Sequence, residues 1–228
     1  MSSQHHESAA KGADGRMVDR MLFFSDAVFA IVLTIMVLDL HAPLIRAGAA
    51  AKSAATLWAA LAAMAPTFWA YGMSFALVGL WWTIHMRVTR SLHRFDWPTA
   101  ATNLVFILTV TLIPFASSLT GQNPDNPAAA VVYWGVNAGT SFALTALVIL
   151  STRGDGRLIG TITKRERLSR VVQSAGPGLG FVAGAWLANT GRPDLSQWCW
   201  VLIFPFMSLS RAVAGKTAAP PPASHKAG

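Results

Sequence analysis

The chain contains 228 residues, of which 53% are hydrophobic and 12% are charged, and its formal net charge is +8. Soluble domains carry about 25% charged residues, so this composition excludes an ordinary soluble domain and indicates a membrane protein. Basic loops beside anionic lipid headgroups account for the positive charge, and binding to nucleic acid is not expected. The single cysteine, Cys199, excludes a disulfide framework.

Six apolar segments follow one another along the chain and predict six transmembrane helices. A helix rises about 1.5 Å per residue, so about 20 apolar residues cross the hydrocarbon core of a bilayer. The sequence therefore predicts an all-α polytopic membrane domain over residues 16–213. Its helices are expected at about residues 21–41, 55–86, 97–119, 128–151, 168–189 and 194–212. The flanking residues 1–15 and 214–228 are rich in small residues and proline, and they are predicted to be disordered.

Prolines and glycines inside the spans predict local kinks and close helix packing. Pro66 and Pro114 are expected to kink the second and third helices. Small residues also repeat every four positions in two helices, a spacing that lets helix backbones approach closely. They are Gly176, Gly180, Gly184 and Ala188 in the fifth helix, and Gly135, Gly139 and Ala143 in the fourth.

The positions of lysine and arginine predict the orientation in the membrane. With six spans, all of the 18 basic residues lie on one side except Arg46, Lys52 and Arg192. Cytoplasmic loops carry the excess of basic residues in membrane proteins. The sequence therefore predicts a multi-pass protein of the cell membrane with both termini in the cytoplasm. An odd number of spans would scatter the basic loops over both sides, so the charges also favour an even number.

The first span is unusual because it carries two carboxylates, Asp26 and Asp39. A carboxylate inside a membrane helix is costly unless it is paired, so Asp26 is expected to face protein or water. One interpretation is that Ser25 and Asp26 cap the start of the helix. The other is a hydrogen-bonded cluster, because His85 and Asn103 are predicted to lie at the same membrane level as Asp26.

Four short motifs within residues 20–115 carry a resemblance to a known family. They are Arg20-x-x-x-Phe24-Ser25-Asp26, Trp82-x-x-His85, Asn103-Leu-Val-Phe-x-Leu and Leu112-Ile-Pro-Phe115. Together they resemble the lysosomal potassium channel family, transmembrane protein 175, and its bacterial homologues. The first motif is fairly specific, and the order of all four along the helices adds to the resemblance. The later helices agree with the family only in number and spacing.

The resemblance implies a potassium-permeable channel. Bacterial members hold one set of six helices per chain and assemble as tetramers, so it implies a homotetramer around a central pore lined by the first helix. The chain contains no Thr-Val-Gly-Tyr-Gly filter, and the resemblance implies a hydrophobic constriction at Ile31 in its place. Potassium is then the permeant ion, no cofactor or metal is expected, and the partners are further copies of the chain and membrane lipids.

The spacing of apolar residues in the first helix is compatible with that pore. Ile31, Ile35 and Leu38 lie at i, i+4 and i+7, on one face. Spacing alone favours a stripe that faces lipid or a neighbouring helix, whereas the resemblance favours stacked apolar rings that act as a gate. Thr34 lies near the same face and offers a hydroxyl to a passing ion. Asp39 is either part of an acidic ring that concentrates cations or a solvated helix end.

The motif residues are expected to support the pore rather than to select ions. By resemblance they bind the first three helices together behind the pore, so the loss of Asp26 is expected to damage folding or opening more than ion choice. The set comprises Arg20, Phe24, Ser25, Asp26, Trp82, His85 and Asn103.

Other function classes fit the sequence less well. A secondary transporter, coupled to protons or cations through Asp26 and His85, would show repeated halves with interrupted helices. Residues 128–210 hold no second Phe-Ser-Asp motif, which weakens that alternative. An enzyme is not expected, because the chain lacks His-Glu-x-x-His, Gly-x-Ser-x-Gly and a Cys/His cluster with metal spacing. A purely structural membrane subunit is a further alternative.

Overall fold

The structure is a computed structural model that describes residues 2–45, 53–94, 96–153, 158–160, 162–203, 205, 206 and 208. These residues form helices and their connections, which confirms the predicted all-α class. The elements are α1 (Ser2–Ile35) with a 3₁₀ continuation η1 (Met36–Asp39), α2 (Ala54–Ala63), α3 (Ala65–Thr89), α4 (Trp97–Thr111), α5 (Ile113–Gln122), α6 (Pro127–Ser151), α7 (Lys164–Asn189), α8 (Pro193–Ser196) and a 3₁₀ turn η3 (Cys199–Leu202).

Most of the described chain lies in helices that are long and apolar enough to cross a membrane. Four segments qualify, residues 15–39, 97–122, 127–151 and 164–189, and the pair α2 and α3 makes a fifth if it is one bent span. The sixth predicted span, 194–212, is described only in part and forms the short elements α8 and η3 at its start. Residues 204, 207 and 209–212 lie outside the described residues, so a sixth span stays a prediction.

Helix breaks occur beside both prolines at which the sequence predicts kinks. The helices α2 and α3 meet at a bend of 50°, and Pro66 lies in the first turn of α3. Leu112 separates α4 from α5, and Pro114 lies in the first turn of α5. Proline has no N–H to donate and its ring clashes with the preceding turn, so each helix restarts at the proline. The expected helices 55–86 and 97–119 are therefore each divided in two.

The N-terminal segment differs from the prediction of disorder over residues 1–15. The helix α1 begins at Ser2 and continues without a break into the first span. This segment contains no proline and several alanines. Extending an existing helix needs no new nucleus, so such residues continue a helix that the apolar span has already formed. The predicted disorder of residues 214–228 falls outside the described residues.

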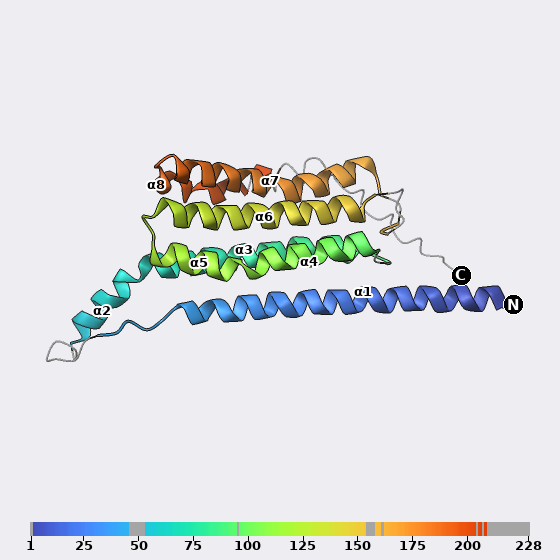
Figure 1. The fold of residues 1–228 in the computed structure, drawn as a ribbon, viewed down its shortest axis with the longest axis horizontal. Helices are drawn as coiled ribbons and strands as arrows, with labels where there is room; N and C mark the ends of the chain where they lie inside the picture. The colour runs from blue at the N-terminus through green and yellow to red at the C-terminus, as the bar shows by residue number, and fades with distance from the viewer. Residues whose placement is uncertain are drawn as a thin grey trace, which may run out of the picture.

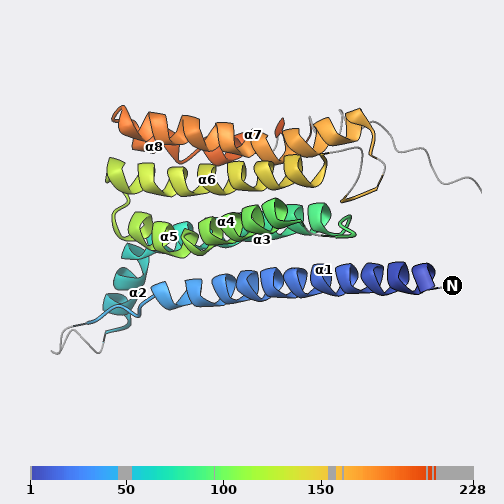
Figure 2. The same cartoon turned by 45° about the vertical axis from the view of Figure 1, so that its right-hand side comes forward.

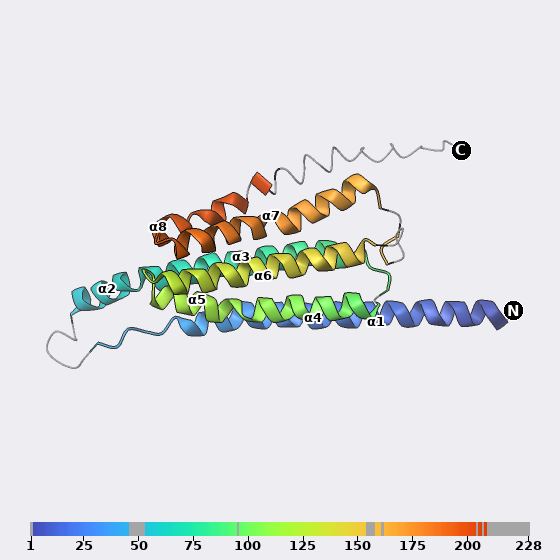
Figure 3. The same cartoon turned by 45° about the horizontal axis from the view of Figure 1, so that its top comes forward.

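The bundle places α1 at one edge. Figures 1 and 2 show α1 next to the layer that contains α3 and α4, with α6 and α7 on the far side of that layer. Figure 3 shows α2 projecting from the bundle, and no residue of α2 is buried. The centre of the core lies among α3, α4, α6 and α7, where Trp81, Phe106, Leu144 and Phe181 are fully buried, and one face of α1 packs against it. The last turns of α3 and α6 and the first turns of α4 and α7 share one end of the bundle (Figure 1).

The glycines of α6 and α7 do not all serve close packing. A Cβ built on Gly184 would lie 3.1 Å from the ring of Trp134, and one on Gly180 would lie 3.3 Å from Leu202. These contacts agree with the predicted close approach along α7. A Cβ on Gly135 or Gly139 would meet nothing within 4 Å, so these two glycines of α6 make no close helix contact among the described residues.

Gly178, which the sequence pattern does not single out, lies where α7 packs closely against Ser141 of α6. A Cβ there would lie 2.7 Å from Ser141 Oγ and 3.0 Å from the ring of Phe142. Ser141 Oγ already donates a hydrogen bond to the carbonyl oxygen of Ser174 at 2.5 Å, so the hydroxyl has little room to move. The glycine therefore lets the two helices meet at this depth.

We expect Gly178→Ala to destabilise the fold by about 1–3 kcal/mol, because overpacking displaces Ser141 and Phe142. Gly135→Ala is the matched control in a helix interior, and it should leave stability unchanged or raise it by up to about 1 kcal/mol through helix propensity. Thermal denaturation of both variants in the same detergent measures the difference. Equal melting temperatures for the two variants would contradict the packing argument.

Asp96 caps α4 at the end of the bundle where the basic residues gather. Its carboxylate accepts a hydrogen bond from the Thr99 N–H at 3.1 Å and pairs with Arg153 at the end of α6. Burial pushes the pKa of Asp96 upward, but the hydrogen bonds from Thr99 and Arg153 outweigh it and hold the pKa below its usual value. A carboxyl with a lowered folded pKa stabilises the fold above its unfolded pKa, and this contribution is lost as the pH falls through the folded value.

We expect Asp96→Asn to be modestly less stable than the parent at pH 7 and equally stable once the pH is well below about 3.9, the ordinary aspartate pKa. Asparagine keeps an oxygen that caps the helix, so the difference isolates the charge. The effect is modest because both partners are partly exposed to solvent. Melting temperatures measured across pH test this, and a difference between parent and variant that stays the same from neutral to acidic pH would contradict the role of the charge.

Candidate functional site

One stripe of α1 attaches this helix to the bundle. Val18, Ser25, Phe29, Val32 and Met36 are buried and follow one another at spacings of seven, four, three and four residues. This is the spacing of one helical face. The face contacts α3 and α4, the two helices that carry the motifs around His85 and Asn103.

A chain of hydrogen bonds joins three helices inside this contact. His85 Nε2 of α3 donates to Asn103 Oδ1 of α4 at 2.8 Å, and Asn103 Nδ2 donates to Ser25 Oγ of α1 at 3.1 Å. Ser25 Oγ donates in turn to the carbonyl oxygen of Met21 at 2.9 Å. The side chains of His85, Asn103 and Ser25 are at most 1% exposed. The amide of Asn103 therefore bridges the helices, with both of its polar atoms used.

Asp26 lies beside these hydrogen-bonded residues and has a separate hydrogen-bond donor. Trp82 Nε1 donates to Asp26 Oδ1 at 2.9 Å, which ties α1 to α3 a second time. Because α1 begins at Ser2, the interpretation of Ser25 and Asp26 as an N-terminal cap is wrong. Asp26 is a carboxylate in the middle of a helix, and the indole N–H provides the hydrogen bond that such a group needs when it leaves water.

Two aromatic rings that the sequence analysis gave no role enclose the imidazole of His85. Phe106 stacks on it with ring centroids 5.2 Å apart, and Phe29 lies 5.8 Å away in a tilted orientation. Both rings are buried. Phe29 follows Ser25 by one turn of α1, and Phe106 follows Asn103 by one turn of α4. Because each ring follows a predicted cluster residue by one helical turn, this spacing in the sequence could have predicted that both rings pack against the cluster.

The remaining predicted residues of α1 lie on the outward face. Ile31, Ile35 and Leu38 are 57%, 42% and 70% exposed. Thr34 is also exposed, and its hydroxyl donates to the carbonyl oxygens of Ala30 and Ile31 in its own helix, each at 2.9 Å. Asp39 is half-buried at the end of η1.

Arg20 and Phe24 do not join the hydrogen-bonded cluster. Both are exposed on α1, whereas their neighbour Ser25 is buried against α3 and α4. The structure thus divides the predicted motif network into an inward group and an outward pair. The inward group comprises Ser25, Asp26, Trp82, His85 and Asn103.

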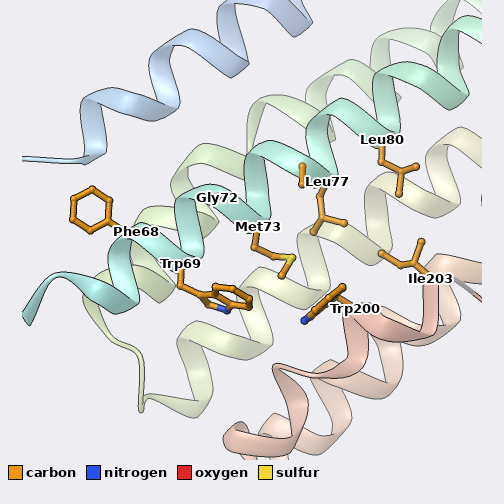
Figure 4. Close-up of a pocket in the computed structure, with 9 residues that line it drawn as sticks. Phe68, Trp69, Gly72, Met73, Leu77, Leu80, Trp200 and Ile203 are labelled. Carbon is orange, nitrogen blue, oxygen red and sulfur yellow. The ribbon is translucent and has the colours of Figure 1, made fainter. Parts of the chain in front are cut away.

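A pocket of about 390 Å³ lies elsewhere, between α3 and the turn η3. Figure 4 shows Trp69, Met73 and Leu80 of α3 facing Trp200 and Ile203 across it. The described residues that line it include no titratable side chain. The pocket is separate from the motif cluster. Among the described residues, no group of three or more His, Cys, Asp or Glu side chains is placed to hold a metal ion.

Comparison with known proteins places these features in a family. Residues 20–114 match the family model described as endosomal/lysosomal potassium channel TMEM175. A potassium channel of Chamaesiphon minutus is 30% identical over 73% of this chain and 82% of its own length. A potassium channel of Streptomyces collinus is also 30% identical, over 72% of this chain and 82% of its length.

Two further comparisons agree with this match. The crystal structure of a lysosomal potassium-selective channel TMEM175 homolog from Chamaesiphon minutus has a TM-score of 0.70 at 24% identity. It covers 86% of this chain and 99% of that chain, and at this identity it shows the shared fold. The mouse endosomal/lysosomal proton channel TMEM175 is 35% identical over 47% of this chain and 21% of its own length.

Proposed function

We propose that this chain, which belongs to the TMEM175 family of potassium channels, forms a potassium-permeable cation channel as a homotetramer. Membership makes it a membrane protein of a channel family rather than of an enzyme family. In the proposed assembly, α1 of each copy lines a central pore. Potassium is the permeant ion, and no cofactor takes part.

The outward face of α1 is the observation that carries this proposal. Its buried stripe fastens α1 to α3 and α4, while Ile31, Ile35 and Leu38 on the other side stay exposed among the described residues. A large exposed apolar face on a membrane protein marks a surface for lipid or for another subunit. Four copies that meet along α1 would place these side chains around one axis.

The proposed gate is a set of stacked apolar rings. Four copies of Ile31 form the narrowest ring, and Ile35 and Leu38 form the next two along the axis. Rings of this kind block ions when the pore dewets and pass them when it widens. Thr34 then offers hydroxyl oxygens between the rings, and four copies of Asp39 form an acidic ring that raises the local cation concentration.

The proposed topology has six spans, with both termini in the cytoplasm of a cell-membrane protein. Basic residues gather at the end of the bundle that α3, α4, α6 and α7 share, which supports this topology. They are Arg87, Arg90, Arg153 and Lys164. Basic residues concentrate on the cytoplasmic side. A sixth span brings the second terminus back to that side.

Flux measurements on purified protein in liposomes test the channel. We expect potassium efflux that exceeds sodium efflux, with caesium measured beside them, from protein that is tetrameric by cross-linking. Folded tetramers that pass no cation would overturn the proposal. Fluxes driven by a proton gradient in the same vesicles test the alternative, a transporter coupled through Asp26 and His85. That alternative has less support, because both side chains lie on the inward side of α1, away from its exposed face.

A further inference from the structure

The pocket between α3 and η3 is shaped by one row of residues on α3. The row is spaced four residues apart and consists of Phe68, Gly72, Ala76 and Leu80. Its two middle members are small, and a Cβ built on Gly72 would meet nothing within 4 Å. Figure 4 shows Phe68 at one end of the pocket and Leu80 at the other. The large side chains therefore bound a space that the small residues between them leave open.

This pocket has a buried floor and an exposed rim. Leu77 of α3 and Ile203 on the opposite wall are 3% and 5% exposed, whereas Phe68 and Trp69 are 45% and 55% exposed. Trp200 of η3 lies across the space from α3 (Figure 4). The pocket is thus closed by side chains toward the core and open toward the outside of the described bundle.

The position of the pocket along α3 gives its depth in the membrane. It begins at Phe68, one turn after α3 starts, and lies in the half of α3 away from Arg87. The distance from Phe68 to Leu80 is about 18 Å of helix, slightly more than half of a hydrocarbon core of roughly 30 Å. Trp69 lies at the end near the membrane boundary, where indoles are enriched. The pocket therefore extends over about one leaflet of the bilayer.

The described lining favours an apolar occupant over water. Its side chains are aliphatic, aromatic or the thioether of Met73, and only the indoles of Trp69 and Trp200 carry a polar atom. A water molecule is retained in a cavity only where about two to four polar partners surround it. Protein interiors are otherwise close-packed, because an empty space loses the attraction between neighbouring atoms. At this depth the abundant apolar molecule is lipid.

The width of the pocket distinguishes a hydrocarbon chain from a helix of another copy. Gly72 and Ala76 have the small-residue spacing at which transmembrane helices approach one another. However, a volume of about 390 Å³ over a length of about 18 Å gives a mean cross-section of about 22 Å². A helix with its side chains is about 10–12 Å across and needs several times that area. A single hydrocarbon chain fits, because non-bonded carbon atoms pack about 4 Å apart.

We propose that this pocket binds one acyl chain of a membrane phospholipid, which enters beside Phe68 and Trp69 and extends along α3 to Leu80. The site is separate from the outward face of α1, and it stands independently of the proposed channel. Only the assignment of the lipid to the outer leaflet rests on the proposed topology.

Photolabelling tests the site in the purified full chain, reconstituted with a phosphatidylcholine that carries a diazirine in its acyl chain. The adducts are located by mass spectrometry of peptides. We expect adducts on Met73 and Trp200 severalfold above those on Leu104 and Leu108, which are exposed on α4 outside the pocket.

Two substitutions that fill the pocket and one matched control make the test specific. Gly72→Leu and Ala76→Leu each place a larger side chain in the space, and each should lower the labelling of Met73 severalfold. Gly135→Leu makes the same change at an exposed glycine of α6 that also has nothing within 4 Å of its Cβ position. Because Gly135 does not line the pocket, this control should leave the labelling unchanged.

Each other result overturns the acyl-chain site. Equal labelling of Met73 and Leu104, or labelling of Met73 that survives both pocket-filling changes, would show ordinary surface lipid. Equal losses in Gly72→Leu and Gly135→Leu would show the same. Adducts on Met73 that form only after the assembly is dissociated would show that another copy of the chain covers the pocket. The measurement detects binding and not flux, so a folded chain that conducts no ions but is labelled here would count against the channel alone.

Discussion

Replacing Ile31 with alanine is expected to raise cation flux severalfold and to weaken the preference for potassium over sodium. In the proposed tetramer the change removes the outer carbons of four side chains from the narrowest ring. A wider ring holds water more readily, so the barrier to a hydrated ion falls. The preference for potassium over sodium weakens as well, because both ions can then pass with more of their water. Liposome flux with potassium and with sodium, measured at equal protein density, gives both quantities.

The matched control for this experiment is Leu104→Ala. Leu104 is 47% exposed and lies on α4, so its truncation removes a similar exposed apolar side chain from a helix that is not proposed to line the pore. Both variants should fold, because exposed side chains contribute little to the core. If Ile31→Ala and Leu104→Ala conduct alike and select alike, Ile31 is not the constriction.

Replacing Asn103 with alanine is expected to lower the free energy of unfolding by about 2–4 kcal/mol. The change leaves the buried His85 Nε2 without its acceptor and Ser25 Oγ without its donor, and an unsatisfied buried group costs about 1–3 kcal/mol. It also separates α1 from α3 and α4 at the level of the motif. We expect a melting temperature several degrees lower, measured in one detergent.

Two comparisons make this prediction specific. Asn123→Ala removes an exposed asparagine whose amide donates only to Leu119 in its own helix, and it should change stability far less. His85→Ala combined with Asn103→Ala should cost less than the sum of the single changes, because both break the same hydrogen bond. Strict additivity of the two changes would mean that the bond between them does not contribute.

The same hydrogen bonds link stability to the proposed gate. Within the described chain, α1 is fastened by an apolar stripe and by polar contacts from Ser25 and Asp26 to α3 and α4. Ile31 follows these residues by less than two turns, on the other side of the same helix. A substitution that removes the hydrogen bond from Asn103 or Trp82 to α1 should therefore shift the side chains proposed to narrow the pore. Cation flux should then change together with stability.

Much of the architecture was accessible from local features of the sequence. Long apolar runs predict helices by their length, and Pro66 and Pro114 predict breaks because proline cannot donate an N–H at any position in any fold. The Phe24-Ser25-Asp26 motif and its companions identified the family, which the comparisons show. These features depend on residues close together in the chain, so they can be read without knowing how the helices pack.

The tertiary structure decided what depends on the rotation and contact of whole helices. It selected Asn103 as the bridge between His85 and Ser25, and it turned Arg20 and Phe24 away from that bridge. It made Gly178 a packing contact and left Gly135 open, although both are glycines within helices. A few tens of degrees of helix rotation move a side chain between a buried seam and an exposed face, and the sequence pattern of one helix does not specify that angle.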